Sequence, residues 1–396
     1  MNNISIKNMS DCFGCGVCME ICPKNAITMT VKHDGAEYPT IDMKKCVDCG
    51  LCMKKCPCKE NEGVKSTNIF AAAIKDKQGI KNSASGGIFY ELAKKTVCEN
   101  GVVYGAAYIQ NVRGLSVEHI RIDSMDKLKT LQGSKYVQSR IYKILPLVKK
   151  DVFEGKKVLF SGTPCQIGGL YAYVGNKHTN LSTVEIICHG APGTSIFEKY
   201  MEYLENKVDA QISDFRFRDK SRGWGFCVKA TINRNNQIKE KIIPSDLSSY
   251  YSYFLSWSIS RESCYSCYFA SEKRIADMTI GDFNGIQIVH PEMLLQHGGV
   301  FDENMGVSCV LLNSINGKRM FDSIKNDILF LESDFEHVSK YNHQLIAPCH
   351  VGSSRKVFFK SLSTGWDSVE KTFKKESGLK YIKRLLREII KYKNFV

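Results

Sequence analysis

The sequence has no apolar run of about 18 residues, the length at which a helix can cross a bilayer. Its first residues, MNNISIKNMSDC, also lack the apolar stretch that is typical of a signal peptide. We therefore expect no transmembrane segment and a cytoplasmic location.

Common nucleotide-binding signatures are missing as well. No G-x-G-x-x-G follows an expected strand, which disfavours a nicotinamide dinucleotide fold, and no G-x-x-x-x-G-K-[ST] is present to hold a nucleoside triphosphate. Helix-turn-helix, zinc-finger and RNA-binding signatures are also absent, although the formal net charge is +14. We expect no nucleic-acid partner, and the basic surface fits a phosphate-bearing cofactor or an acidic partner protein.

Cysteine, in contrast, is abundant, with 17 residues, and eight of them form two copies of the spacing C-x2-C-x2-C-x3-C-P. The copies are Cys12, Cys15, Cys18 and Cys22, and Cys46, Cys49, Cys52 and Cys56. A loop with a cysteine at every third position can bind three corners of a cubane 4Fe-4S cluster. In two-cluster ferredoxins the last cysteine of each run binds the other cluster, so we predict that Cys56 completes the first set and Cys22 the second.

The alternative for these runs is zinc, whose structural sites usually take their ligands in separated pairs. Gly14, Gly16 and Gly50 favour iron, because a loop folded around a cluster leaves little room for side chains. Thiolate-bound iron also needs a reducing compartment, in agreement with a cytoplasmic location. The runs predict a protein that moves single electrons.

A length of 396 residues suggests two or three domains. We expect an α+β ferredoxin-like domain at residues 1–60, a polar linker at 59–67, an α/β domain with a mixed sheet at 68–330, and a C-terminal extension at 331–396. Strands are expected at 68–76, 102–108, 157–160 and 184–188, helices at 88–100, 141–153 and 195–207, and short antiparallel strands between 211 and 243.

Ligands of α/β sheets gather at the carboxyl ends of strands, and three expected loops fit that place. Ser85, Gly86 and Gly87 would offer free N–H groups at a helix start as a seat for phosphate, although a plain glycine-rich helix entry has the same pattern. The loops at 162–166 and 188–193 each follow a strand, and each contains a cysteine.

Those two loop cysteines, Cys165 and Cys188, make up a set of four thiolates with Cys264 and Cys267, which is the number one further cluster requires. Buried thiols or a zinc site are the alternatives. Cys349 is a reserve ligand. We interpret the other cysteines as small apolar fillers: Cys58, Cys98, Cys227 and Cys309. His189 and His350 could relay protons, but single histidines are more often structural.

Several stretches resemble one known family. They are SASGGIFYELAKK, LQGSKYVQS, VLFSGTPCQIGGL, VEIICHGAPG, FRFRDKSRGWGF, CYSCYFASEKRIADMTIGDFNG and GVSCVLLNS, between about residues 68 and 313. By these stretches the chain resembles the beta subunit of coenzyme F420 hydrogenases and dehydrogenases, with a bacterial-type two-cluster ferredoxin domain fused in front.

The resemblance implies that the α/β domain binds FAD and one 4Fe-4S cluster, with Cys165, Cys188, Cys264 and Cys267 as cluster ligands. It places the flavin near Ser85, Gly86, Gly87, Gly133, Ser134, Lys135, Tyr136, Gly281, Asp282 and Phe283, and it assigns no catalytic residue. Relatives include deazaflavin oxidoreductases, a chlorophyll side-chain reductase, and bacterial proteins encoded near polysaccharide genes, so family membership does not define the substrate.

The expected function is that of an iron-sulfur flavoprotein oxidoreductase, which passes electrons through FAD between a hydride donor, coenzyme F420 or similar, and ferredoxin-type clusters. The first alternative is a ferredoxin-dependent reductase of an organic substrate, for example in polysaccharide metabolism. The second is a purely electron-carrying subunit. The expected partner is a redox protein or a small-molecule hydride donor.

The last 26 residues contain nine Lys or Arg and two Glu. Their apolar residues Leu379, Ile382, Leu386, Ile389 and Ile390 recur at helical spacing. Such a basic amphipathic helix could lie on an anionic membrane surface or bind an acidic partner. Alternatively, its apolar face packs on the protein itself and its charged side is solvated.

Overall fold

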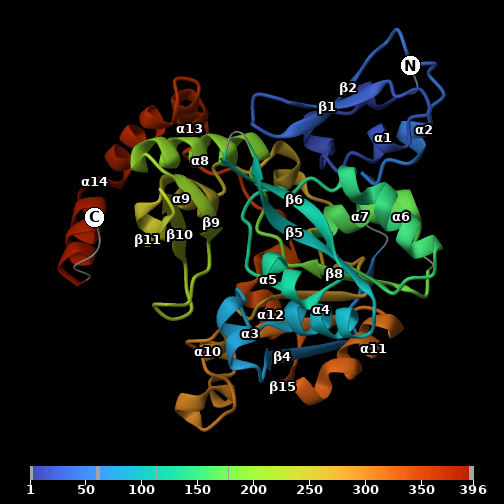
Figure 1. The fold of residues 1–396 in the computed structure, drawn as a ribbon. Coiled ribbons are helices and arrows are strands. Elements are labelled where there is room, and N and C mark those ends of the chain that lie inside the picture. The colour runs from blue at the N-terminus through green and yellow to red at the C-terminus, as the bar shows by residue number, and fades with distance from the viewer. Residues whose placement is uncertain (1–2, 59–62, 112–113, 177, 392–396) are drawn as a thin grey trace.

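Figure 1 shows the computed structural model, which describes residues 3–58, 63–111, 114–176 and 178–391. Of the segments expected from the sequence, residues 59–62 of the linker and residues 392–396 of the C-terminal extension lie outside the described residues. Within the described ranges, no helix is both long and apolar enough to cross a membrane.

The largest element is an eight-stranded mixed sheet with the order β15-β4-β14-β13-β8-β7-β5-β6. The neighbours β13, β8, β7 and β5 are parallel, and antiparallel strands flank them on both sides. The strands are β4 (Asn68–Ile74), β5 (Val102–Asn111), β6 (Gly114–Ile122), β7 (Val158–Gly162), β8 (Leu181–Ile186), β13 (Met278–Asp282), β14 (Ser308–Leu312) and β15 (Ile328–Ser333). The mixed α/β architecture expected from the sequence is therefore present.

Helices cover both faces of this sheet. α4 (Ile88–Cys98) and α11 (Ile315–Ile324) pack on one face, and α6 (Leu145–Phe153) and α7 (Pro164–Val174) pack on the other. The pleat of β5 explains the two layers, because Val103 enters the first core whereas Val102 and Tyr104 enter the second.

A second lobe lies at the left of Figure 1, with a three-stranded antiparallel sheet of order β11-β10-β9. Its elements are α8 (Thr194–Val208), β9 (Gln211–Arg216), β10 (Cys227–Arg234), β11 (Gln237–Pro244), α9 (Ser249–Leu255), α13 (Arg355–Leu362) and α14 (Trp366–Lys391). Its core is aromatic: Tyr200 stacks on Tyr250 at 5.2 Å between ring centroids, and Trp366 lies 5.0 Å from Tyr200. The antiparallel strands expected between 211 and 243 are confirmed.

The N-terminal segment lies at the top of Figure 1, above α7. It contains α1 (Val17–Glu20), the antiparallel pair β1 (Ile27–Val31) and β2 (Glu37–Ile41), and α2 (Leu51–Lys54). Gly16 and Gly50 both precede a short helix with φ of 73°, so the two cysteine runs repeat in backbone conformation as well as in sequence. Whether this arrangement is ferredoxin-like in detail stays a prediction.

Shorter elements connect these parts. They are β3 (Val64–Lys65), α3 (Lys77–Asn82), α5 (Leu128–Leu131), β12 (Lys273–Arg274), α10 (Ile286–Val289) and α12 (Phe335–Tyr341), with 3-10 turns that include η2 (Met9–Asp11), η4 (Tyr142–Ile144) and η6 (Glu262–Ser266). β3 pairs with β12. β15 crosses residue 330, so the main sheet includes residues on both sides of that expected domain boundary.

Two expected elements differ from the structure. The strand expected at 184–188 is β8, which ends at Ile186, so Cys188 follows it by two residues. The expected loop at 162–166 is largely helical, because α7 begins at Pro164 and Cys165 therefore lies in its first turn. Thr163 and Gln166 form a capping box at this helix start, which explains why the chain turns helical so soon after β7.

Candidate functional site

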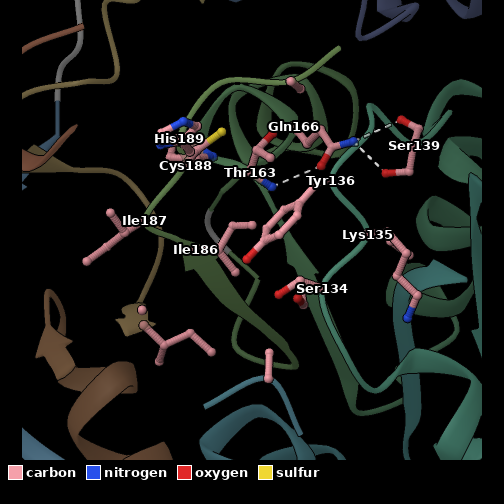
Figure 2. A pocket seen from close by; sticks show the side chains of 18 of the residues that line it. Ser134, Lys135, Tyr136, Ser139, Thr163, Gln166, Ile186, Ile187, Cys188 and His189 are labelled. Atoms are coloured by element: carbon pink, nitrogen blue, oxygen red, sulfur yellow. Dashed lines mark hydrogen bonds between the residues drawn. The ribbon is translucent and has the colours of Figure 1, made fainter. Parts of the chain in front are cut away.

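One cavity of about 310 Å³ lies at the carboxyl ends of β7 and β8. Its lining includes the start of α4, residues 131–139, and the segment that follows β8 (Figure 2). Of the residues expected to surround a flavin, the lining includes Ser85, Gly87, Gly133, Ser134, Lys135, Tyr136, Gly281 and Asp282. Gly86 and Phe283 are not in it, and Phe283 is buried in the main core.

The expected phosphate seat is partly used by the protein itself. The Gly86 N–H donates to the Ser308 hydroxyl at 3.0 Å, and the Ser85 hydroxyl donates to the Val307 carbonyl at 2.9 Å. A Cβ on Gly86 would lie 2.3 Å from the carbonyl oxygen of Ala72, so close backbone packing requires this glycine. The expectation that Gly86 presents a free N–H group was therefore wrong. Gly87, at φ +85°, still borders the cavity at the start of α4.

Residues 133–136 form a second wall. Figure 2 shows the Tyr136 side chain extending into the cavity, and its ring stacks on Phe254 at 4.5 Å. The Lys135 side chain points away from Tyr136, and its Nζ donates to the carbonyl oxygens of Thr130 and Gln132 at 3.1 and 2.8 Å. Burial lowers the pKa of Lys135 to about 7, so its charge is weakly held near neutral pH.

The four candidate core cysteines line the same cavity from three directions. Cys165 lies in the first turn of α7, Cys188 follows β8, and Cys264 and Cys267 lie in and just after η6. Burial raises the pKa of all four thiols, and the thiol of Cys188 interacts electrostatically with the other three. The structure thus brings together residues that are separated by up to about 100 positions in the sequence.

Cys349, the reserve ligand, lies beside this set. Its thiol donates to the Cys264 carbonyl at 3.3 Å, and burial raises its pKa to about 12. Its electrostatic interaction is with Cys264, whereas Cys188 interacts with three members of the set. The arrangement therefore favours Cys188 over Cys349 as the fourth thiol.

The first N-terminal run shows the crossing expected of a two-cluster domain. Cys12, Cys15 and Cys18 each interact electrostatically with Cys56, the last cysteine of the other run. Cys22 packs in the small core that contains Cys52. These contacts agree with the predicted exchange of the fourth ligand between the two runs.

Within the part of the chain that the structure describes, no three His, Cys, Asp or Glu side chains converge closely enough to hold a single metal ion. The four ligands of a cubane cluster each bind a different iron atom. They consequently stand further apart than the ligands of one zinc ion, whose bonds to sulfur are about 2.3 Å long. The spacing of these thiols is therefore compatible with clusters.

The N-terminal and core cysteine sets are neighbours. Cys15 interacts electrostatically with Cys165, and a Cβ on Gly169 of α7 would lie 3.5 Å from the Cys15 Sγ. Cys58, interpreted from the sequence as a filler, lies in a small core with Cys56, Cys165 and Cys267. Its position between the two sets had no signal in the sequence, because the spacing motif ends at Cys56.

The histidines have structural surroundings. His189 lines the cavity and stacks on Trp257 at 4.8 Å, and its buried Nε2 has no hydrogen-bond partner among the described residues. His350 contacts the edge of the same tryptophan at 4.2 Å. Sequence reasoning missed His119, which also lines the cavity and bonds the Ser161 carbonyl and the Ser139 hydroxyl, each at 2.8 Å.

Comparisons with known proteins agree with this arrangement. Residues 155–337 match the family model for the C terminus of the coenzyme F420 hydrogenase/dehydrogenase beta subunit, and residues 11–59 match that of a 4Fe-4S dicluster domain. Among solved structures, the chain is similar to one from the F420-reducing NiFe hydrogenase complex of Methanosarcina barkeri. The two share 14% identity at a TM-score of 0.43, over 79% of this chain and 94% of that chain. No curated protein matches the sequence.

Proposed function

Because residues 155–337 belong to the coenzyme F420 hydrogenase/dehydrogenase beta subunit family and residues 11–59 are a 4Fe-4S dicluster domain, we propose that this iron-sulfur oxidoreductase moves electrons between a hydride donor and its N-terminal clusters. The donor would be coenzyme F420 or a similar deazaflavin. FAD would bind in the cavity, and Cys165, Cys188, Cys264 and Cys267 would hold a third cluster.

The observation that carries this proposal is the shared cavity. The candidate flavin residues and the four core cysteines border the same space, and Cys15 of the first N-terminal set adjoins Cys165. A hydride acceptor, the core cluster and the first N-terminal cluster could thus stand in one short series. Such a series is what stepwise electron transfer requires, since each step would cross only a few side chains.

The residues present fit a flavin. Gly133 has φ +79°, and no described atom lies within 4 Å of a Cβ built on it, so that side of the segment is open. Gly87 and Gly133 would allow close approach of the cofactor, and Tyr136 would pack against its ring. Bound FAD would supply the conversion between two-electron hydride transfer and the one-electron chemistry of clusters.

Around that cofactor the protein's own groups would fix the site. The Gln166 amide donates to the Ser139 carbonyl and hydroxyl, both at 2.9 Å, while its oxygen accepts from the Thr163 N–H (Figure 2). These bonds join the wall at 133–139 to the helix turn that carries Cys165. Movement of one wall is therefore coupled to the cysteine set.

Anaerobic stopped-flow mixing tests the donor. Reduced coenzyme F420 would lose a hydride and a proton, and the two electrons would leave singly to a one-electron acceptor. We expect rapid bleaching of the flavin band by reduced F420 but not by NADH, followed by slower cluster reduction. Full reduction by reduced ferredoxin, with no bleaching by either hydride donor, would instead support the reductase. A preparation with all clusters and no flavin would leave the electron carrier.

A cavity-filling variant tests the flavin site. Ile186, at the end of β8, lines the cavity and is partly exposed to it, so Ile186→Trp should lower flavin content severalfold while iron content stays unchanged. Ile238→Trp is the matched control, because Ile238 is an exposed strand residue of β11 outside the cavity lining. Equal flavin content in the two variants would argue against this cavity as the site.

A redox partner would approach at the second N-terminal set. Cys49 is exposed, as are Met43 and Val47 beside it. Exposed lysines surround this run: Lys44, Lys45, Lys54 and Lys55. Apolar residues within a basic rim fit an acidic electron-transfer protein.

A further inference from the structure

Arg261 has an unusual place between the two cysteine sets. It precedes η6, three residues before Cys264, and is only 2% exposed. Its backbone N–H donates to the Ala191 carbonyl at 3.0 Å, and its carbonyl accepts from the Cys264 N–H at 3.1 Å. The main chain of Arg261 is thus part of the frame that holds Cys264 near the segment following Cys188.

The side chain of Arg261 extends into the N-terminal domain. Its Nη2 donates to the Glu37 carbonyl at 3.1 Å, and its guanidinium carbon lies 4.5 Å from the centre of the Tyr38 ring. A Cβ on Gly14 would lie 2.3 Å from Nη1, so the guanidinium packs against the loop between Cys12 and Cys15. One residue therefore contacts the frames of both cysteine sets.

A third contact ties the same group to the cavity wall. Nη1 donates to the Gln138 side-chain oxygen, and the Gln138 amide donates to the Phe13 carbonyl at 2.7 Å. The remaining donor, Nε, is buried and has no hydrogen-bond partner among the described residues. A buried, unused N–H of a permanent cation is costly unless something negative faces it.

The negative groups around Arg261 are mostly thiols. Burial raises the pKa of the Cys12, Cys165 and Cys264 thiols, and the positive charge of Arg261 acts on all three to lower it. Asp34 is the carboxylate that also interacts with it. This carboxylate is engaged elsewhere, since it accepts from the Tyr38 hydroxyl at 2.6 Å and from the Ala36 N–H at 3.1 Å.

We propose that Arg261 is a positioning residue for electron transfer, whose buried charge favours the reduced form of both the core cluster and the first N-terminal cluster. This inference rests on the proposed function for the core cluster. One-electron reduction makes a cluster more negative by one charge, and a nearby cation in a medium of low dielectric stabilises that state. Because the charge is shared, it keeps the two potentials close to each other.

The test is a redox titration of the holoprotein monitored by electron paramagnetic resonance. In Arg261→Gln the midpoint potentials of two clusters should shift downward, while that of the second N-terminal cluster stays in place. Arg261→Lys keeps the charge and should restore most of both potentials. Unchanged potentials in a fully loaded Arg261→Gln protein would overturn the proposal.

Arg140 provides the matched control for a purely structural role. Its Nε donates to Glu37 at 2.8 Å and its Nη2 to Glu198 at 3.2 Å, so it also joins the N-terminal domain to the main body. Arg140→Gln should lower the melting temperature without moving any midpoint potential. If Arg261→Gln loses iron, the loaded Arg261→Lys decides, since wild-type potentials there support the charge and shifted potentials oppose it.

Failure of the proposed function would look different. A wild-type protein with only two clusters would remove the core cluster. The effect of Arg261→Gln on the first N-terminal cluster would still be measurable, and a downward shift of that one potential would retain the charge effect of Arg261.

Discussion

Arg274 and Glu185 form a buried ion pair beside the cavity, with exposures of 2% and 0%. The Arg274 side chain also donates to the carbonyl oxygens of Phe269 and Ser271 at 3.1 Å, so it fixes the segment that follows Cys267. Because Arg274→Met would leave an unpaired buried carboxylate, we expect a loss of about 3–5 kcal/mol in unfolding free energy, measured by chemical denaturation.

Two controls accompany this variant. The double variant Arg274→Met with Glu185→Leu should recover much of the loss, because no buried charge then remains unpaired. Lys65→Met breaks the exposed pair with Glu272 and should change stability by less than about 1 kcal/mol. A similar loss in Lys65→Met would contradict the role of burial.

His119 predicts a pH dependence. Burial lowers its pKa from 6.5 to about 4, so between these values the unfolded chain binds the proton more readily than the folded protein. Stability should therefore fall as the pH falls from 6.5 toward 4. His119→Gln keeps hydrogen-bonding atoms without this titration, and its melting temperature should depend less on pH in that window. Parallel pH profiles of the two proteins would exclude His119 as the cause.

At this scale the sequence predicts the cysteines well, because cluster ligands must occur at fixed spacing. It does not reveal Arg261 or His119, since a single arginine or histidine has no spacing to read. Gly86 shows the opposite error: the glycine pattern is real, but the structure uses it for close packing against Ala72 instead of a free N–H group.

At the scale of elements, the sequence predicts α4 and α8 closely, because both have clear apolar periodicity and, for α4, a glycine at each end. β6 was not predicted. Its buried residues include the polar Ser116 and His119, which hide the alternation on which a strand prediction depends. The early start of α7 was missed for a similar reason, since its capping residues read as a loop.

The C-terminal helix α14 bears on the question the sequence left open. Its aliphatic residues do not pack inward: Leu379 is 72% exposed and Ile390 80%, and Ile382, Leu386 and Ile389 are also exposed. Glu388 is buried instead and pairs with Arg222 and Arg384. We therefore retain peripheral contact with an anionic membrane as part of the proposal, since exposed Lys380, Lys383 and Arg387 lie on the same helix.

Vesicle sedimentation tests this contact. The full protein should sediment with anionic phospholipid vesicles at low salt, and Leu386→Ser with Ile390→Ser should reduce the bound fraction severalfold. Ile315→Ser is the matched control, because Ile315 is a 76% exposed aliphatic residue on another helix. If the wild type stays in the supernatant but binds an acidic protein, the helix is a protein contact.

At the scale of the whole molecule, iron content separates the cluster models. Three clusters would give about 12 iron atoms per chain and two would give about eight. Anaerobically purified Cys165→Ser should fall from the first value to the second, with matching loss of acid-labile sulfide. Cys98→Ser is the control, because Cys98 is exposed at the end of α4 and should change nothing. A wild-type value near eight that Cys165→Ser leaves unchanged would remove the core cluster.

The sequence predicts the parts of the molecule better than their assembly. The divisions at residues 1–60, 68–330 and 331–396 remain proposals, and the packing of Gly14 on Arg261 and Gly16 on Tyr142 could not be read from the chain. The cysteine pattern accounts for these glycines through the clusters alone. The structure adds that they also adjoin the main body, so each has two reasons to lack a side chain.

The position of β4 has a consequence for synthesis. This apolar strand emerges early from the ribosome, yet both its sheet neighbours, β14 and β15, come more than 200 residues later, as the pairing of Ala72 with Ser308 illustrates. Until then its backbone edges stay unpaired, which favours association with other chains. Nascent or truncated chains that end before β14 should therefore need chaperone protection that the complete chain does not.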